Sequence, residues 1–434
     1  MDKMADDLGR AGAWCGQNKY LSAIKNAFQN FMPLTIAGAI GVLWCNVLVN
    51  ESTGLGIFFK PIMALEFLNP AFQAVNFCTI SCITVGITLG IAQEIGVWNM
   101  GAEKAGYIPG LVGLAAWLSV TNTSHMVEGA KEAFTGIAGN ELGATGLFTG
   151  MIIGVLSVEL FCFFEKQDAL KIKMPEQVPP GVARAFEVLV PATITLIITA
   201  CIGSACYNLT GLYLNDVIKN GIQGPLGAVG ATIPGVMIIY LVIMLFWLVG
   251  IHGNNMLSAV KEALFTPLAL ENVEKFNKGE KPTNIINMYA LQMWGEFGGS
   301  GVTIGLVIAI MIFGKREDNK AIATLSLVPG LFNINETVTF GIPMVLNPIL
   351  GIPFVFACLV TILVGYVLTV IGFCPVACLT VPWTTPPIVF GFLACGANVM
   401  GAVTQAILIV VSTVIYTPFL ISYEKYQNKQ AAEA

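Results

Sequence analysis

The chain has 434 residues, of which 56% are hydrophobic and only 11% are charged. A soluble domain carries about 25% charged residues, so these charges are too few to cover a soluble fold, and the outer surface is predicted to face lipid. The net charge of −5 offers no basic face of the kind that nucleic-acid binding needs, so no nucleic-acid partner is expected. These values indicate an all-α polytopic membrane protein.

Regular membrane spans are predicted from near residue 32 to residue 250. A span needs about 20 mostly apolar residues. The stretches that meet this requirement are 32–50, 75–93, 106–121, 146–164, 186–207 and 226–250. Mildly amphipathic segments at 51–74 and 208–224 are predicted to lie along the membrane interface as amphipathic helices.

The second half of the chain is less regular. It contains two long spans, at 347–372 and 398–421. Other apolar stretches are short or are broken by proline, glycine and polar residues: 300–314, 321–342 and 373–395. Broken hydrophobic segments are the best sequence indication of a transporter's binding site. We therefore predict a scaffold domain over residues 1–224 and a site-bearing domain over residues 225–434.

The segments between the spans differ in charge. Lysine and arginine gather at 165–184, 261–281 and 315–320. The positive-inside rule places these loops, together with both chain termini, on the cytoplasmic side. If the last two of these loops share a side, residues 285–314 must enter the membrane and return. The same reasoning predicts that 321–342 is re-entrant.

Glu336 is the first candidate for chemistry. It lies in an apolar stretch, where a carboxylate is costly and is by default a functional candidate. Its neighbours Asn333 and Asn335 add amides, which both donate and accept hydrogen bonds, as sugar hydroxyls require. The alternative is a structural ion pair. No lysine or arginine occurs between Lys320 and Lys425, which argues against that alternative.

His252 follows the sixth predicted span, in the sequence GIHGNN at 250–255. The flanking glycines allow the backbone to bend there, and Asn254 and Asn255 add further amides. A lone histidine is usually a structural residue, but this setting favours a site role. The other histidine, His125, lies in a predicted external loop and is interpreted as solvated.

A glycine-rich run, WGEFGGSG, covers residues 294–301. Exposed backbone at the tip of a re-entrant segment is the favoured interpretation, with Gly298 and Gly299 as binding positions, and simple helix packing is the alternative. Glu296 is a second carboxylate in this run, and a place at the cytoplasmic edge is the alternative for it.

Neither a cofactor nor a metal site is predicted. The glycine-rich run lacks the Lys-Ser/Thr ending of a nucleotide-binding loop, and no such motif occurs elsewhere in the chain. The 11 cysteines are scattered, and with only 2 histidines none has metal-ligand spacing. Most of the cysteines lie in or beside apolar runs, where free cysteine packs as a small hydrophobic residue.

Two tryptophans are candidates for stacking on sugar. An aromatic face offers an apolar body to the C–H face of a pyranose ring. Trp247 lies shortly before His252, and Trp383 lies in the proline-rich sequence VPWTTPP beside Thr384. The alternative for both is a place in the interfacial belt or the core.

The stretch 329–348, PGLFNINETVTFGIPMVLNP, resembles the signature of the membrane IIC subunits of the bacterial phosphoenolpyruvate-dependent phosphotransferase system. The resemblance is to the lactose, cellobiose and diacetylchitobiose branch, and most of all to its N,N′-diacetylchitobiose permeases. It covers essentially the whole chain, because HGNN at 252–255, GGSG at 298–301 and WTTP at 383–386 match in pattern and order. Thr337 departs from the family, which commonly has proline after the glutamate.

The resemblance implies about ten transmembrane helices plus two re-entrant hairpins, assembled as a homodimer in the bacterial cytoplasmic (inner) membrane. It implies that the N-terminal domain makes the dimer contact and that the C-terminal domain holds a β-linked disaccharide, diacetylchitobiose or cellobiose-like. The 6-hydroxyl of the bound sugar is then phosphorylated by the phosphocysteine of a separate cytoplasmic IIB partner.

Each candidate residue receives a role in this expectation. Glu336 holds the 6-hydroxyl and accepts its proton, and His252 shares that hydroxyl or stabilises the developing charge. Trp247 and Trp383 stack on the sugar rings. The remaining substrate-binding candidates satisfy other hydroxyls or brace the loops: Asn254, Asn255, Gly298, Gly299, Asn333, Asn335 and Thr384.

The residues by themselves leave two further classes open. An ion-coupled secondary sugar transporter would use Glu336 as a proton or sodium site, without phosphorylation. A membrane-embedded enzyme would use Glu336 and His252 as an acid–base pair and would act without a partner. The transported product, sugar phosphate or free sugar, distinguishes the first of these from a phosphotransferase subunit.

Overall fold

A computed structural model describes Arg10, Trp14, Gly56 and the ranges 17–51, 59–125, 134–175, 177–225, 230–342 and 344–433. Helices dominate these ranges, and their one sheet is an antiparallel pair, β1 (Ser124–His125) and β2 (Phe134–Thr135). The expectation of an all-α fold is therefore confirmed. Most of the predicted cytoplasmic N-terminus lies outside the described residues.

Long apolar helices match the predicted spans. Within the described residues, 5 helices are long and apolar enough to cross a membrane: Lys19–Leu48, Ala144–Glu165 (α8), Pro180–Thr210 (α9), Gly351–Val370 (α19) and Val399–Gln430. The number rises to 7 if each of two bent pairs is one span. Shorter apolar helices are α6 (Ile108–Val120) and α12 (Ile233–Leu248). The polytopic membrane architecture is thus confirmed.

The chain forms two compact units. The C-terminal unit comprises residues 1–16, 39–74 and 228–434, and the N-terminal unit comprises residues 17–38 and 75–227. Residues 39–74 include η3 (Lys60–Leu68) and most of α3 (Asn69–Asn76), and they group with the C-terminal unit. The roles of the two predicted domains, scaffold and sugar carrier, stay predictions.

Glycines bring the helices of the N-terminal unit close together. Helices α4 (Ile83–Met100), α6, α8 and α9 pack on one another around Trp117, which is fully buried. A Cβ on Gly150 of α8 would lie 2.2 Å from the Thr88 hydroxyl, and one on Gly86 would lie 2.1 Å from the ring of Phe31. Only glycine allows such contacts, because small residues let membrane helices approach closely.

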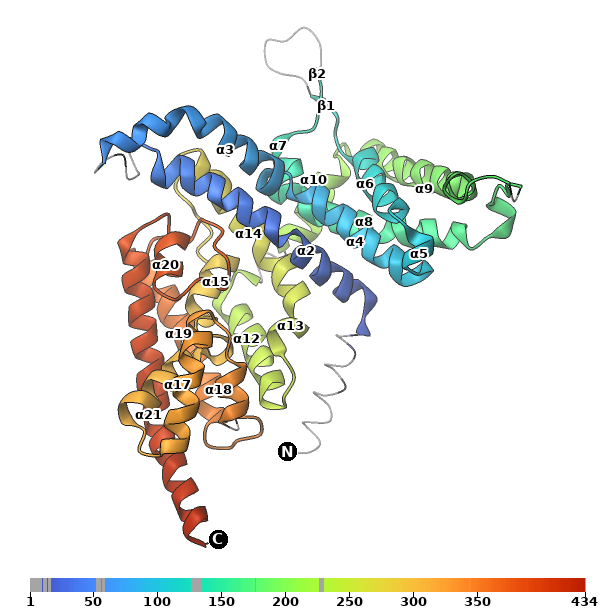
Figure 1. Cartoon of the computed structure of the whole chain (residues 1–434). Coiled ribbons are helices and arrows are strands. Elements are labelled where there is room, and N and C mark those ends of the chain that lie inside the picture. The colour runs from blue at the N-terminus through green and yellow to red at the C-terminus, as the bar shows by residue number, and fades with distance from the viewer. Residues whose placement is uncertain are drawn as a thin grey trace. The chain divides into compact units, whose positions relative to one another are not determined.

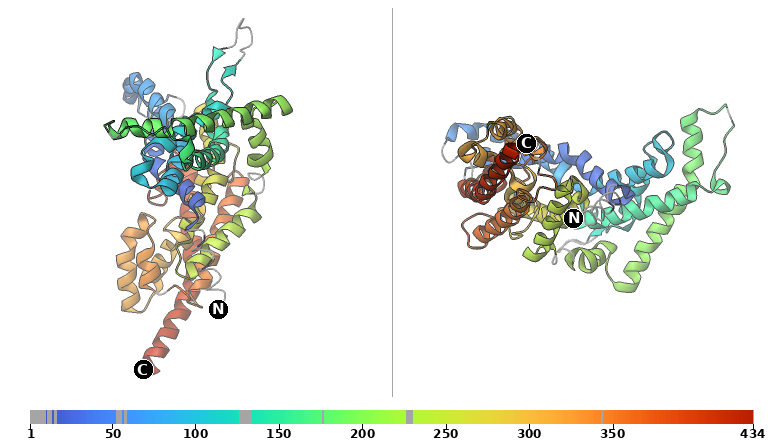
Figure 2. Two further views of the ribbon diagram at one scale, coloured as in Figure 1. Left: turned by 90° about the vertical axis from the view of Figure 1, so that its right-hand side faces the viewer. Right: turned by 90° about the horizontal axis from the view of Figure 1, so that it is seen from below.

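The C-terminal unit is built on its last helix. α21 (Val399–Glu433) packs against α16 (Ile304–Phe313), α19 and α20 (Val389–Ala394), and α19 also contacts α12 and α15 (Met288–Gly295). α17 (Glu317–Leu331) lies beside α18 (Glu336–Gly341), as Figure 1 shows. The last turns of α21 extend past these neighbours (Figures 1 and 2).

The predicted interruption of 285–314 is present as a sharp bend. Met288–Val302 and Ile304–Phe313 meet at 59°. Between α15 and α16, a turn contains Gly298, Gly299 and Gly301 with φ of 68°, 86° and 76°. These left-handed values favour glycine, which has no Cβ to oppose them. We call residues 296–302 the glycine turn.

The segment predicted as a loop over 261–281 is mostly helix. α14 (Ser258–Asn277) covers it, and Lys261 is only 4% exposed. The sequence prediction counted Lys261 among the basic residues of a cytoplasmic loop. The residue that pairs with Lys261 lies far from it in the sequence, so a count of local charge cannot reveal the pairing.

Candidate functional site

His252 and Glu336 lie next to each other in the C-terminal unit. The two atoms His252 Nε2 and Glu336 Oε1 are 3.8 Å apart, and the side chains are 38% and 48% exposed. His252 occupies the break between α12 and α13 (Gly253–Met256), and Glu336 is the first residue of α18. Among the described residues, His252 is the only basic side chain within 4 Å of the Glu336 carboxylate.

The backbone around His252 is fixed by glycine and by an aromatic neighbour. A Cβ on Gly253 would lie 2.0 Å from the Ile243 carbonyl oxygen, so only glycine fits where α13 begins. The Nδ1 atom of His252 accepts a hydrogen bond from the Asn255 backbone N–H at 3.3 Å. The ring of Trp247 lies against the imidazole, with ring centroids 4.5 Å apart. These contacts direct the Nε2 edge of the ring toward Glu336.

Glu336 is placed by the turn that precedes it. Asn333 has a φ of 63°, a left-handed value that asparagine tolerates better than most residues. α18 then begins at Glu336 and includes Thr337 in its first turn. Proline is favoured at such a position because its missing N–H would be unpaired there in any case. Threonine keeps the same helix start, so the family departure at Thr337 leaves the local backbone helical.

Asn333 connects three segments of the site. Its Oδ1 accepts from the Gly298 N–H at 2.7 Å. Its Nδ2 donates to the Thr385 carbonyl at 3.1 Å and also to the Trp383 carbonyl. Both amide hydrogens and one acceptor position are thereby used within the protein. In this conformation Asn333 braces the loops.

Ser300 joins two of the other predicted asparagines. Asn254 Nδ2 donates to the Ser300 hydroxyl at 2.9 Å, and Asn335 Nδ2 donates to the Ser300 carbonyl at 2.8 Å. Ser300 is 3% exposed and Asn335 is 4% exposed. The sequence analysis did not single out Ser300, although its place in the glycine-rich run was a signal. Asn255, by contrast, has an exposed side chain.

Gly298 and Gly299 are buried, and the Gly298 N–H donates to Asn333 outside the turn. The Gly298 carbonyl accepts from the Thr303 hydroxyl at 2.7 Å, and the Gly299 N–H donates to the Glu296 carbonyl at 3.0 Å. A Cβ on Gly299 would lie 2.6 Å from the Asn335 side chain. These glycines are therefore required by the shape of the turn, whatever else they contact.

The two candidate tryptophans differ in exposure. Trp383 is 45% exposed and Trp247 is 2% exposed. Thr384, next to Trp383, is half-buried. Trp383 can offer a ring face to a ligand in this conformation, whereas Trp247 contacts His252 instead. Their stacking roles stay predictions.

Glu296 forms a buried ion pair. Its Oε1 contacts Lys261 Nζ and accepts the Tyr240 hydroxyl at 2.7 Å. The side chains of Lys261 and Glu296 are 5% and 18% exposed, which does not fit a position at a solvated edge. The sequence analysis missed Lys261 and Tyr240 as neighbours of this carboxylate.

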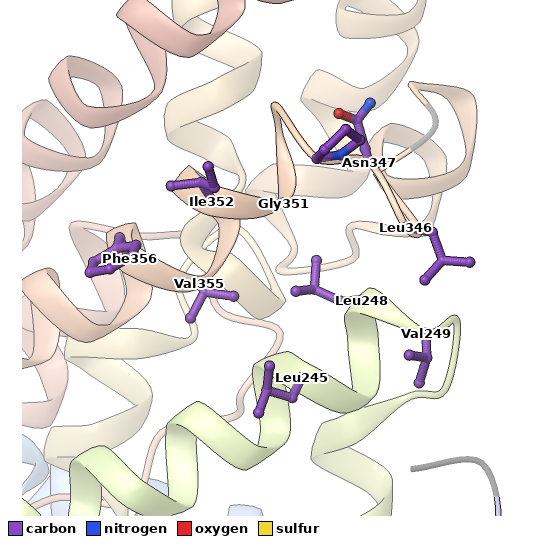
Figure 3. A pocket seen from close by; sticks show the side chains of 10 residues that line it. Leu245, Leu248, Val249, Leu346, Asn347, Gly351, Ile352, Val355 and Phe356 are labelled. Atoms are coloured by element: carbon purple, nitrogen blue, oxygen red, sulfur yellow. The ribbon is translucent and has the colours of Figure 1, made fainter. Parts of the chain in front are cut away.

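A separate apolar cavity of about 280 Å³ lies between α12 and α19 (Figure 3). Aliphatic and aromatic side chains form most of its lining, including Leu245, Leu248, Val355 and Phe356. Among the described residues that line it there is no carboxylate or histidine and one amide, Asn347, whose Oδ1 accepts from two backbone N–H groups. A sugar would find few partners there, so the polar cluster around Glu336 is the better candidate.

Comparison with known proteins identifies the family. The family described as "Phosphotransferase system, EIIC" matches residues 25–358, more than half of the chain. The chain belongs to the EIIC family. The resemblance seen in the sequence is confirmed, and this EIIC chain is a membrane subunit for sugar transport in the phosphotransferase system.

Similar proteins match this EIIC chain over nearly its full length. The "PTS system oligo-beta-mannoside-specific EIIC component" of Bacillus subtilis (strain 168) is 33% identical, over 98% of this chain and 94% of the relative. The "Lichenan permease IIC component" of the same organism is 32% identical, over 97% and 92%. The "PTS system cellobiose-specific EIIC component" of Lactococcus lactis subsp. lactis (strain IL1403) is 28% identical, over 96% of each.

A solved structure also matches along the whole chain. It is the crystal structure of the transporter ChbC, the IIC component from the N,N′-diacetylchitobiose-specific phosphotransferase system. The TM-score is 0.88 and the identity is 29%, with 97% of each chain covered. The match supports the helical transporter fold described above.

Proposed function

We propose that this EIIC chain carries a β-linked disaccharide, diacetylchitobiose or cellobiose-like, across the bacterial cytoplasmic membrane. The names of its relatives support this class of sugar, since they specify oligo-β-mannoside, cellobiose and N,N′-diacetylchitobiose. The observation that carries the proposal for the site is the 3.8 Å approach of His252 Nε2 to Glu336 Oε1.

The proposed chemistry is phosphoryl transfer to the 6-hydroxyl of the bound sugar. The phosphocysteine of a cytoplasmic IIB partner supplies the phosphoryl group. The S–P bond breaks, the O6–P bond forms, and the O6 proton passes to Glu336 while the cysteine leaves as a thiolate. Such transfer depends mainly on positioning of donor and acceptor, which is the contribution expected of a transport subunit.

The remaining candidates receive roles that follow from their contacts. Trp383 is proposed to stack on a sugar ring, and Trp247 to hold the His252 ring, against which it packs. Asn333 and Asn335 are proposed as braces because their amide hydrogens bond to protein carbonyls. Asn255 and Thr384 are proposed to contact sugar hydroxyls, and Asn254 to hold the glycine turn through Ser300.

The test is sugar phosphate formation by membranes that contain the chain, with and without a phosphorylated IIB partner. Radiolabelled diacetylchitobiose, cellobiose and lactose are compared as substrates. We expect labelled sugar 6-phosphate only when both proteins are present, and none from Glu336→Gln, which keeps the size of the side chain but removes the base. Accumulation of free sugar along an ion gradient without IIB would instead establish an ion-coupled transporter.

The assembly is also a proposal. We infer a homodimer in which the N-terminal domain makes the contact while the C-terminal domain moves the sugar. Light scattering of the detergent-purified protein should give twice the mass of one chain after subtraction of the detergent. A monomeric mass at all detergent ratios would contradict this assembly.

A further inference from the structure

The ion pair between Lys261 and Glu296 lies inside the unit that carries the candidate site. Lys261 is on α14 and is 4% exposed. Tyr240, fully buried on α12, donates its hydroxyl at 2.7 Å to the same Glu296 oxygen that Lys261 contacts. One carboxylate oxygen therefore joins α12, α14 and the end of α15.

Both partners of this pair stand at the edge of the site. Glu296 is the first residue of the glycine turn, whose Gly298 and Ser300 are bonded to Asn333 and Asn335. Lys261 lies on the helix that follows His252 and α13 in the chain. The pair thus links the segment that contains His252 to the glycine turn. The residues just before Glu336 bond to that same turn.

The energetics argue that this pair does more than stabilise the fold. Taking two charges out of water costs several kcal/mol per ion, and replacing a buried pair by apolar residues of similar volume is often neutral or stabilising. Charge-assisted hydrogen bonds are, however, short and directional. What the buried pair provides is a defined orientation of Glu296, and with it of the glycine turn.

We propose that Lys261 and Glu296 are positioning residues for sugar binding. Their ion pair fixes the glycine turn against the His252 segment, and neither side chain touches the sugar. This inference rests on the proposed function for its sugar readout, but it also predicts a property of the protein without sugar. The predicted property is slow hydrogen exchange in the glycine turn.

The experiment compares the full-length wild type with Lys261→Met, Glu296→Gln and the double variant, each in lipid nanodiscs. The matched control is Lys278→Met, which removes a Lys–Glu pair at the C-terminal end of the same helix, between Lys278 just after α14 and Glu274 on it. The Lys278 and Glu274 side chains are 58% and 44% exposed, so that pair should be dispensable. Three quantities are measured: the apparent unfolding temperature, the Kd for the disaccharide that the wild type binds, and amide exchange over residues 295–303 by mass spectrometry.

Removing one charge should lower the unfolding temperature, because the other is left buried without a partner. The neutral double variant should recover that temperature. Its Kd should nevertheless stay about tenfold weaker than wild type, a factor worth about 1.4 kcal/mol. The amides of Gly298, Gly299 and Val302 should exchange faster in it, and Lys278→Met should match wild type in every measurement.

Wild-type sugar affinity and wild-type exchange in the double variant would overturn the proposal, since the pair would then serve the fold alone. Wild-type affinity in Lys261→Met would overturn it as well. If the wild type binds none of the sugars, the proposed function fails. The exchange comparison then still decides whether the pair orders the glycine turn.

Discussion

At the scale of single residues, the asparagines act through a side-chain amide that donates and accepts hydrogen bonds at the same time. Asn333 uses its oxygen to accept from Gly298 and its nitrogen to donate to the backbone carbonyls of residues 383 and 385. An aspartate has the same shape but no hydrogens to donate. Amide and carboxylate are therefore not interchangeable at this position.

Asn333→Asp should weaken sugar binding by releasing the loop that carries Trp383. Two carbonyl acceptors lose their donor. A buried group left unpaired costs about 1–3 kcal/mol, and the loss here should lie at the low end, because the bond to Thr385 is partly buried and the Trp383 carbonyl is exposed and can bond to water. Titration calorimetry with the bound disaccharide measures the effect. Asn398→Asp is the matched control, because Asn398 is exposed and its side chain accepts from the Met400 N–H, a bond that aspartate retains. Equal affinities for the two variants would show that Asn333 is no brace.

Trp383→Ala should reduce sugar affinity by about 1–3 kcal/mol, by analogy with the stacking of bases on aromatic side chains. The reason is the loss of an exposed ring face on the loop that Asn333 holds. Trp98→Ala serves as the control, since Trp98 is 58% exposed but belongs to the N-terminal unit. The prediction fails if both variants bind the sugar as tightly as the wild type.

Residue-level predictions depended on how local the signal was. Glu336 and His252 could be selected because a carboxylate in an apolar run, or a histidine between glycines, is unusual within its own window. Lys261 could not, because its partner Glu296 lies on another element. Ser300 lies in the glycine-rich run that was itself selected, but its bonds to Asn254 and Asn335 could not be predicted from the sequence. Contacts between distant segments leave no trace in local composition.

At the scale of elements, the end of α21 holds the start of α17. Glu424 of α21 is 5% exposed and accepts from the backbone N–H of Lys315 at 2.8 Å and from Asn319 Nδ2 at 3.1 Å. A carboxylate at a helix N-terminus also interacts favourably with the helix dipole. α17 leads into Asn333 and Glu336. The contact with Glu424 therefore fixes the N-terminal end of the helix that precedes these site residues.

Glu424→Gln should lower the apparent unfolding temperature of the purified protein. A hydrogen bond to a charged group contributes about 1.5–3 kcal/mol, roughly twice a neutral one, and the change removes the charge. The control is Glu317→Gln at the start of α17, whose side chain is 86% exposed and pairs with Lys320. Thermal unfolding followed by intrinsic fluorescence should separate the two variants. A Glu424→Gln protein as stable as the control would contradict the role given to Glu424.

Element prediction succeeded for the spans and was poorest around 373–395. Hydropathy finds a long apolar helix because nearly every residue in it is apolar. In 373–395 only α20 is an α-helix, and the backbone is held from outside the segment. The Gln405 side chain accepts from the N–H groups of Ile388 and Gly391, both at 2.8 Å. Gln405 lies in the last span, where nothing in the sequence shows that its amide orders an earlier loop.

At the scale of the whole molecule, the charge asymmetry of the loops predicts the orientation in the membrane. Residues 165–184 and 315–320 carry the basic residues. Lys166, Lys171 and Lys173 lie between the long apolar helices α8 and α9, Arg184 lies in the first turns of α9, and 315–320 lies outside the long apolar helices. The positive-inside rule then puts these segments and both termini in the cytoplasm. The IIB partner would approach from that side.

The orientation is tested with two reporters fused after Ala434. A fluorescent protein that folds only in the cytoplasm should be bright, and alkaline phosphatase, which is active only outside it, should be inactive. The control is the same pair of reporters fused after Gly211, between α9 and the following α10 (Leu214–Ile218), where the predicted side is opposite. Active phosphatase at the C-terminus would reverse the assigned topology.

The contact between His252 and the Asn255 backbone determines the tautomer of the imidazole. Because Nδ1 accepts the Asn255 N–H, the neutral ring carries its proton on Nε2, the nitrogen that lies 3.8 Å from Glu336. A hydroxyl bound between the two side chains would meet a donor on one side and a carboxylate on the other. Its oxygen would accept from the imidazole while its hydrogen points to Glu336, leaving one lone pair free for in-line attack on phosphorus.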